Sequence, residues 1–308
     1  MASPSRHLPD FDALWNYDRP AETEQAFLAI LEQIADDGSS AYRLELLTQI
    51  ARTQGLQRRF DAAHATLDRV QAALDDRAAD ESGTETGTPG VRYLLERGRV
   101  FNSAGEPERA RPLFLAAWRQ ATAAGQDGQD GYAVDAAHML GIVESAEQSL
   151  EWNRKALALA EGSADPRARR WRGSLYNNMG WTYHAASEYE LALAMFESAR
   201  DAWEADGQTG RAPHARWAIA RALRSLGRTQ EALARQQALL EEGERAGMSG
   251  GLVSEEIGEC LLALGREQEA QPHFARAWAL LSQDAWLAEA EPARLDRLRM
   301  LGAGSEGA

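Results

Sequence analysis

The chain has 308 residues and a formal net charge of −14, with 26% charged and 44% hydrophobic residues. A surface this acidic repels phosphate backbones and anionic lipid, which argues against nucleic acid and membrane surfaces as partners and leaves peptides and proteins. The single cysteine, Cys260, excludes an internal disulfide framework and a thiolate metal cluster. No run approaches the ~18 apolar residues that a membrane span needs.

The start of the chain, MASPSRHLPDFDALW, has no apolar stretch of the kind found in a secretory signal. Lys155 is the one lysine, and all other fixed cations are Arg. This bias, together with frequent Ala and Gly, is typical of a GC-rich bacterial genome. The sequence therefore predicts a cytoplasmic bacterial protein.

Residues 1–40 are predicted to form N-terminal capping helices. Pro20 stands where proline is favoured, at the start of a helix. Phe27, Leu28, Leu31 and Ile34 then share one apolar stripe of that helix. A shorter segment, LPDFDALW, precedes it.

Residues 41–283 repeat one pattern, and its most complete copy is YNNMGWTYHAASEYELALAMFESA at 176–199. Gly180 interrupts the first predicted helix of this copy, where glycine costs roughly 0.5–1 kcal/mol relative to alanine. That cost is reasonable if a second helix approaches closely. We therefore expect Gly180 to lie beside Ala192, with Phe196 filling the space around the contact.

Five further copies can be aligned, at 44–70, 93–118, 130–157, 217–240 and 255–278. Each has a first helix with small and apolar residues, a short turn, and a second helix that begins near a small residue. The equivalent small residues are Ala63, Ala110, Ser149, Ala192, Ala232 and Ala270, spaced by 38 to 47 positions. The sequence thus predicts an all-α solenoid of about six helix pairs.

The pattern resembles the tetratricopeptide repeat (TPR), whose signature is W-x2-L-G-x2-Y on one helix and A-x3-F on its partner. The 176–199 copy matches it through Tyr176, Gly180, Tyr183, Ala192 and Phe196. The spacing exceeds the usual 34 residues, and is similar to the longer repeats of kinesin light chains and bacterial sensor regulators.

Three other segments complete the predicted organisation. The polar, acidic stretch DDRAADESGTETGTPG, residues 75–90, is expected to be a mobile loop. Residues 284–302 are predicted to form a C-terminal capping helix that begins at Pro292 and turns Leu295 and Leu298 inward. Residues 303–308 are expected to be a disordered tail.

The TPR resemblance implies that the first helix of each pair lines a concave groove. Trp and Arg are common anchors of bound partners, and Asn and Arg can hold a peptide backbone or a carboxylate. Alternatively, the tryptophans pack between repeats and the charges are merely solvated. The residues predicted to face the groove and bind a ligand are Arg52, Arg99, Asn102, His138, Asn177, Trp181, His184, Trp217, Arg221, Arg224, Glu255 and Glu259.

No motif for catalysis or cofactor binding is convincing. The stretch GAGSEG at 302–307 lacks the preceding strand and following helix of a dinucleotide site. A metal site formed by His138 and His184 across the groove would have two ligands, whereas zinc needs three or four. Cys260 is expected to be a buried, inert thiol. The sequence therefore predicts no catalytic residue, no metal and no cofactor.

These observations favour a non-enzymatic module that binds a peptide or protein partner in its groove. The alternative is a sensor for a peptide or small molecule that acts through a separate effector protein. The TPRs that clamp the carboxylate of chaperone tails rely on Lys, Asn and Arg at fixed positions. With one Lys in the chain, that particular partner is not expected.

Overall fold

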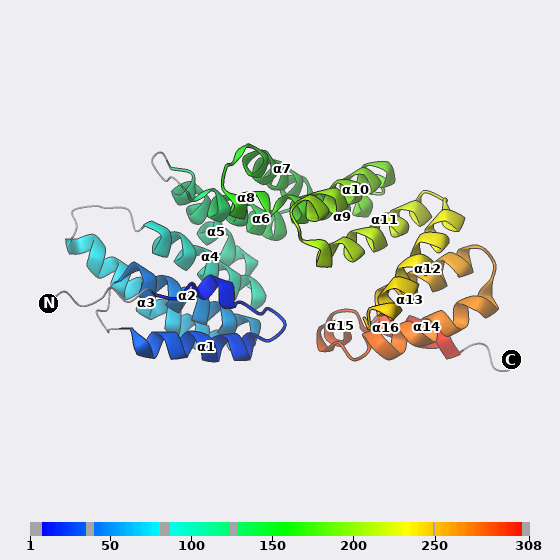
Figure 1. Cartoon of the computed structure of the whole chain (residues 1–308), viewed down its shortest axis with the longest axis horizontal. Coiled ribbons are helices and arrows are strands. Elements are labelled where there is room, and N and C mark those ends of the chain that lie inside the picture. Colours follow the sequence, from blue (N-terminus) through cyan, green and yellow to red (C-terminus); the bar gives the residue numbers. More distant parts are fainter. Residues whose placement is uncertain (1–7, 35–39, 81–86, 124–127, 249, 304–308) are drawn as a thin grey trace. The chain divides into compact units, whose positions relative to one another are not determined.

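The computed structural model describes residues 8–34, 40–80, 87–123, 128–248 and 250–303. The chain divides into two compact units, Met1–Trp171 (unit 1) and Arg172–Ala308 (unit 2). Each unit is described by itself below. Within the described residues both units are helical, and consecutive helices lie side by side as antiparallel pairs (Figure 1).

Unit 1 begins with a short 3-10 turn and one helix, followed by three helix pairs and a final short helix. The first two elements are η1 (Phe11–Leu14) and α1 (Pro20–Gln33). The pairs are α2 (Ala41–Leu56) with α3 (Phe60–Asp80), α4 (Gly87–Ser103) with α5 (Pro107–Ala121), and α6 (Asp130–Val143) with α7 (Ala146–Gly162). The unit closes with α8 (Pro166–Arg169).

Unit 2 also contains three helix pairs and ends in two further helices. The pairs are α9 (Arg172–Ala185) with α10 (Tyr189–Ala205), α11 (Ala212–Ser225) with α12 (Thr229–Arg245), and α13 (Gly251–Ala263) with α14 (Glu267–Leu281). A 3-10 turn, η2 (Thr209–Arg211), leads into α11. The last elements are α15 (Ala285–Ala290) and α16 (Pro292–Ala303). Together the two units contain the six predicted pairs of a TPR-type α-solenoid.

Glycines on the first helices make room for aromatic rings from the second helices. A Cβ placed on Gly180 would lie 2.5 Å from Cε1 of Phe196, so the ring itself fills the space that the glycine leaves. Ala192, one turn before Phe196 on α10, is fully buried. Gly98 meets Phe114 and Gly258 meets Phe274 in the same way.

The small residues that define the repeat spacing are all buried. Each lies in the first turns of a second helix, where a larger side chain would push the paired helices apart. Ala63, Ala110, Ala192 and Ala232 are fully buried, Ala270 is 1% exposed, and Ser149 is 9% exposed. The repeat register read from the sequence is therefore the register of the fold.

Both ends of the loop predicted over 75–90 are helical in the structure. Helix α3 continues to Asp80 because residues 75–80 contain good helix formers, and Gln71 donates a hydrogen bond to Asp75 one turn further on. Helix α4 already begins at Gly87, with Pro89 in its first turn. The remainder, 81–86, lies outside the described residues.

Helices α1 and α16 each bury apolar side chains, although Leu28 of the apolar stripe predicted in α1 is 40% exposed. Phe27 and Ile30 of α1 are buried, as are Leu295 and Leu298 of α16. Helix α16 continues to Ala303, one residue into the predicted tail, and Gly302 packs against the backbone of Ala275. Residues 1–7 and 304–308 lie outside the described residues.

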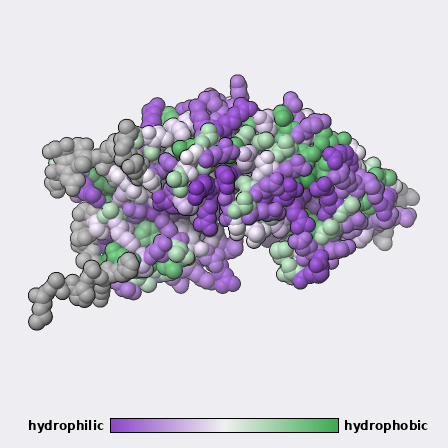
Figure 2. Space-filling view, turned by 45° about the horizontal axis from the view of Figure 1, so that its top comes forward, coloured by the Kyte–Doolittle hydropathy of each residue, from purple (hydrophilic) through white to green (hydrophobic). Residues whose placement is uncertain are grey.

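Hydrophilic side chains predominate on the face drawn in Figure 2, with small hydrophobic areas between them. The described helices include none that is both long enough and apolar enough to cross a membrane.

Candidate functional site

The predicted groove residues all lie on first helices. In this account, the surface formed by the first helices of a unit is called its first-helix face. Unit 1 contributes Arg52 on α2, Arg99 and Asn102 on α4, and His138 on α6. Unit 2 contributes Asn177, Trp181 and His184 on α9, Trp217, Arg221 and Arg224 on α11, and Glu255 and Glu259 on α13.

The two arginines of unit 1 are neutralised by neighbouring first helices. Glu96 of α4 is almost fully buried and accepts hydrogen bonds from Arg52 at 3.1 Å and Arg99 at 2.7 Å. Arg99 also pairs with Asp135 of α6. Burial alone lowers the pKa of Arg99, but the charges of Asp135 and Glu96 outweigh it, so the pKa lies above its ordinary value. These cations hold the helices together.

The chain's own N-terminal segment contacts the first-helix face of unit 1. The guanidinium of Arg52 lies 5.7 Å from the ring of Trp15 and 5.5 Å from that of Tyr17, within the range of cation–π attraction. Trp15 donates a 3.1 Å hydrogen bond to Gln49 of α2. Arg52 is therefore engaged by residues that precede the repeats.

Asn102 and His138 offer little free space. A cavity of about 140 Å³ is lined by Arg52, Arg99, Asn102 and neighbouring residues, which is small against the several hundred Å³ of typical ligand sites. The imidazole of His138 packs 4.8 Å from the ring of Trp171.

Three charged residues predicted in unit 2 also have partners, on the next first helix or on α16. Arg224 donates to Glu256 of α13 at 3.2 Å. Arg294 of α16 donates to Glu255 at 2.9 Å, and Arg297 donates to Glu259 at 3.2 Å. The capping helix α16 thus pairs with both glutamates that were predicted to bind a ligand.

The remaining residues form a distinct group on α9 and α11, here called the α9–α11 cluster: Asn177, Trp181, His184, Trp217 and Arg221. The rings of Trp181 and Trp217 lie 5.5 Å apart at 41°. The guanidinium of Arg221 lies 5.5 Å from the first ring and 5.7 Å from the second. Trp217 is 7% exposed, so it also packs the seam between repeats.

The hydrogen bonding of this cluster is incomplete. Among the described residues, no carboxylate forms an ion pair with Arg221. Its Nε atom is buried without a partner, and so is Oδ1 of Asn177, one helical turn before Trp181. Unsatisfied buried polar atoms cost free energy and occur at few places in a protein. The cluster is therefore a candidate site where a ligand supplies the missing partner.

His184 contributes a neutral hydrogen-bonding group to the cluster. Its Nε2 lies 3.0 Å from Oγ of Ser225 on α11. Burial lowers the pKa of His184 below its ordinary value, and the charges of Arg221 and Arg224 lower it further. Near pH 7 the imidazole is uncharged, and the positive charge at this place is that of Arg221.

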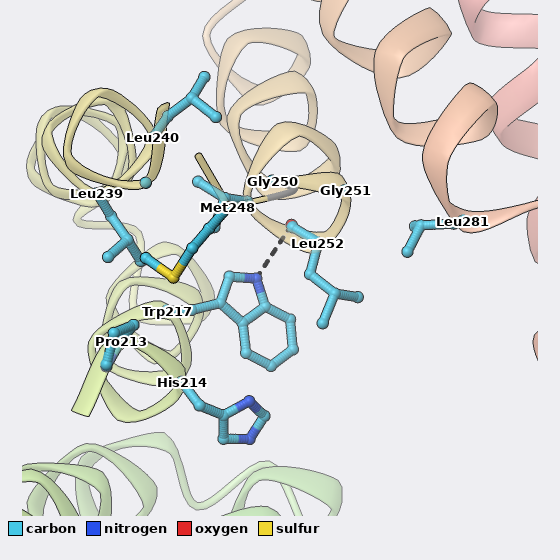
Figure 3. A pocket seen from close by; sticks show the side chains of 12 residues that line it. Pro213, His214, Trp217, Leu239, Leu240, Met248, Gly250, Gly251, Leu252 and Leu281 are labelled. Carbon is cyan, nitrogen blue, oxygen red and sulfur yellow. Dashed lines mark hydrogen bonds between the residues drawn. The ribbon is translucent and has the colours of Figure 1, made fainter. Parts of the chain in front are cut away.

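Trp217 also lines an apolar cavity of about 290 Å³ (Figure 3). Its indole Nε1 donates a 3.1 Å hydrogen bond to the carbonyl of Leu252, which fixes the ring as one wall. The other lining residues come from α11 to α14 and the connection before α13: Pro213, His214, Leu239, Leu240, Gly243, Met248, Gly250, Gly251, Val253 and Leu281. Of the lining residues, only Trp217 was predicted from the sequence. The glycine-rich connection GMSGGLV, where apolar residues flank a break between helices, was the available signal for the rest.

No group of three or more His, Cys, Asp or Glu side chains among the described residues is arranged to hold a metal ion. Burial raises the pKa of the Cys260 thiol to about 12, so it stays protonated at neutral pH.

No model of a protein family matches the sequence, and a search of curated proteins finds no significant match. Solved structures do match. A signal-transduction ATPase with a tetratricopeptide repeat sensor from Pyrococcus horikoshii is 12% identical, with a TM-score of 0.68 over 91% of this chain and 42% of its own. The apo form of RapI is 11% identical, with a TM-score of 0.66 over 90% of this chain and 76% of its own.

A tetratricopeptide repeat protein from Parabacteroides merdae is 14% identical, with a TM-score of 0.53 over 95% of this chain and 98% of its own. At these identities the likeness concerns the fold. It agrees with the six glycine- and alanine-packed helix pairs found above. The chain therefore has a TPR-like fold.

Proposed function

We propose that this protein is a non-enzymatic binding module that takes a peptide or protein partner on its first-helix face, at the α9–α11 cluster. The observation that carries the proposal is the state of Arg221. Arg52, Arg99, Arg224, Glu255 and Glu259, the other predicted groove charges, are all paired within the chain. Arg221 lies beside the paired rings of Trp181 and Trp217, and no carboxylate of the described residues forms an ion pair with it.

The cluster suits an extended acidic segment. A guanidinium binds a carboxylate through two parallel hydrogen bonds, and the buried Oδ1 of Asn177 is an acceptor without a hydrogen-bond partner in the described part of the chain. The tryptophans supply rigid apolar area, and Trp and Arg are the residues most often found at the energetic centre of interfaces. Helix pairs that are already packed lose little entropy when a segment docks on them.

We also propose that the module acts in the cytoplasm of a bacterium and binds neither nucleic acids nor membranes. The net charge of −14 disfavours nucleic acids and anionic membranes as partners. The single cysteine and the arginine-rich, nearly lysine-free composition support a cytoplasmic location in a bacterium.

A random peptide library displayed on phage tests the proposal. Peptides enriched on the wild-type protein should bind Arg221→Gln and Trp181→Ala at least about tenfold more weakly, a loss of about 1.4 kcal/mol. The affinity of Arg221→Lys should lie between those of wild type and Arg221→Gln, because lysine keeps the charge but cannot form two parallel hydrogen bonds to a carboxylate. The matched control is Arg228→Gln, since Arg228 is an exposed arginine paired with Glu231 on α12.

Equal binding of enriched peptides to wild type, Arg221→Gln and Trp181→Ala would place their site elsewhere and refute the proposal. Circular dichroism of each variant, showing the wild-type helical signal, separates a lost contact from a lost fold.

A second candidate is a sensor that acts through a separate effector protein. The apolar 290 Å³ cavity beside Trp217 favours it, because this volume is near the lower end of small-molecule sites. One matched structure is described as containing a tetratricopeptide repeat sensor. Mass spectrometry of metabolites retained by the purified protein decides between the two: a small molecule lost in Met248→Glu but kept in Arg221→Gln supports the sensor.

A further inference from the structure

Helix α11 places the apolar cavity and Arg221 on either side of Trp217. His214 and Trp217 line the cavity, and Arg221 lies over the indole of Trp217 one turn later. An α-helix rises about 1.5 Å per residue, so Arg221 is about 6 Å along the axis from Trp217 and about 10 Å from His214. A cationic group and an apolar cavity are therefore separated by a distance that a few residues can span.

The cavity selects an uncharged, apolar group. Leu240, Met248 and Leu281 reach it from three different elements, and the indole N–H of Trp217 already bonds to Leu252 (Figure 3). His214 is the titratable side chain in its lining, and burial followed by the charge of Arg211 lowers the pKa of that imidazole. Near pH 7 the lining carries no charge. A volume of about 290 Å³ accommodates one large side chain.

Unit 1 contains an example of what such a surface binds. Its Arg92 pairs with Asp12 of the N-terminal segment and lies 5.3 Å from the ring of Phe11. The Phe11 side chain is 5% exposed and packs against Tyr42 and Phe27. Arg92, on a first helix, thus binds the carboxylate of Asp12, and the adjacent residue Phe11 is buried beside the same arginine.

We infer that the partner of the α9–α11 cluster is a segment with one carboxylate and, two or three residues away, one large apolar side chain. The carboxylate binds Arg221, and the apolar side chain enters the cavity beside Trp217. An extended chain advances about 3.3 Å per residue, so two or three residues cover the 6 to 10 Å between the two subsites. This inference rests on the proposed function, and it adds the chemistry and spacing of the ligand.

The charge of the protein restricts the ligand to few carboxylates. Arg221 offers one unpaired cation, whereas the chain as a whole carries a net charge of −14. A second carboxylate on the ligand would therefore be repelled by the acidic protein and would have no cation beside it to bind. A segment with a single acidic residue should bind better than an acidic run.

Fluorescein-labelled nine-residue peptides provide the test. Each contains one Phe and one Glu on a Gly/Ser background, with the two separated by two, three or six positions. The dissociation constants for the full-length protein are measured by fluorescence polarisation. Separations of two or three should give at least about tenfold tighter binding than a separation of six, or than the same peptide with Ala in place of Phe.

Two protein variants identify the subsites. Met248→Glu places a charge on the cavity lining at a side chain that is 48% exposed, and Met300→Glu is the matched control on α16, where Met300 is 65% exposed. Met248→Glu should abolish the advantage of the Phe peptides, and Met300→Glu should leave it intact. Arg221→Gln should weaken every Glu-containing peptide that binds, and Arg228→Gln should not.

The outcomes separate this inference from the proposed function. Binding that depends on Arg221 but is indifferent to Met248→Glu and to spacing overturns the inference and leaves the proposed function standing. Binding unaffected by either variant overturns both. Absence of binding by all the Phe–Glu peptides up to about 1 mM overturns the stated ligand chemistry.

Discussion

At the scale of single residues, glycine and aromatic side chains determine how closely the paired helices approach. Gly98, Gly180 and Gly258 each face a phenylalanine ring from the partner helix. Other glycines in the same fold have open space around them. The role of a glycine here therefore depends on the ring opposite it.

Gly180→Ala should destabilise the protein by roughly 1 kcal/mol, because the new methyl group overlaps the Phe196 ring by more than the gain in helix propensity offsets. Gly243→Ala, in the interior of α12, is the control. A Cβ there meets only Met248, at 4.0 Å, so this variant should be more stable by roughly 0.5–1 kcal/mol. Urea unfolding measures both, and a stabilised Gly180→Ala would refute the packing argument.

Histidines should make the fold less stable in mild acid. Burial lowers the pKa of His64, His184 and His273 in the folded chain. In the unfolded chain they take up protons near pH 6.5, so below about that pH the unfolded state binds more protons and folding is weakened, while above it the contribution is constant.

The urea concentration at the unfolding midpoint should therefore decrease when the pH is lowered from about 7.5 to about 5.5. In His184→Gln, which keeps a hydrogen-bonding group but does not titrate, the fall should be smaller. The difference between the two proteins gives the contribution of His184 protonation, because the change in net charge with pH affects both proteins alike. An identical pH dependence in both would show that His184 does not contribute.

At the scale of elements, ion pairs connect successive first helices. Arg52 and Glu96 join α2 to α4, Arg99 and Asp135 join α4 to α6, and Arg224 and Glu256 join α11 to α13. Between α9 and α11 the connection is different: two tryptophan rings and the His184–Ser225 hydrogen bond take its place. Glu256, the carboxylate whose charge Arg221 feels, forms its ion pair with Arg224, so Arg221 has no ion pair among the described residues.

Arg99→Met should destabilise unit 1 by about 3 kcal/mol, because it leaves Asp135 without its arginine in a largely buried setting and leaves Glu96 with Arg52 alone. The double variant Arg99→Met/Asp135→Leu should recover part of the loss, since the pair is then removed as a whole. Arg266→Gln, which breaks an exposed pair with Glu269, should change stability by less than about 1 kcal/mol. Chemical denaturation gives all three values. A loss for Arg99→Met no larger than for Arg266→Gln would contradict this account.

The helix pairs could be predicted from sequence because they depend on local spacing. Gly180, Ala192 and Phe196 lie within one helix hairpin, and their contacts follow from helical periodicity. The partners of the groove residues could not be predicted in this way. Glu255 bonds to Arg294 on α16, and Arg52 lies under Trp15 and Tyr17, because stacking and chain path bring together residues more than 30 positions apart.

At the scale of the whole molecule, the chain contains two compact units with their own buried clusters. That of unit 2 extends from Ala192 and Phe196 of α10 to Leu295 and Leu298 of α16. The α9–α11 cluster and the apolar cavity both lie within this unit. The proposed ligand site is thus complete in one half of the chain.

Residues 172–308, expressed alone, should therefore fold and retain ligand binding. The expected result is a helical circular dichroism spectrum, a cooperative urea transition, and an affinity for library-enriched peptides within about threefold of that of the full chain. A folded fragment that binds none of these peptides would show that the site needs unit 1.

A crystal structure of the protein with a library-enriched peptide tests the central claim most directly. The claim predicts a peptide carboxylate within hydrogen-bonding distance of the Arg221 guanidinium, next to Trp181 and Trp217. A peptide seated on another face, with Arg221 still lacking a carboxylate, would contradict it.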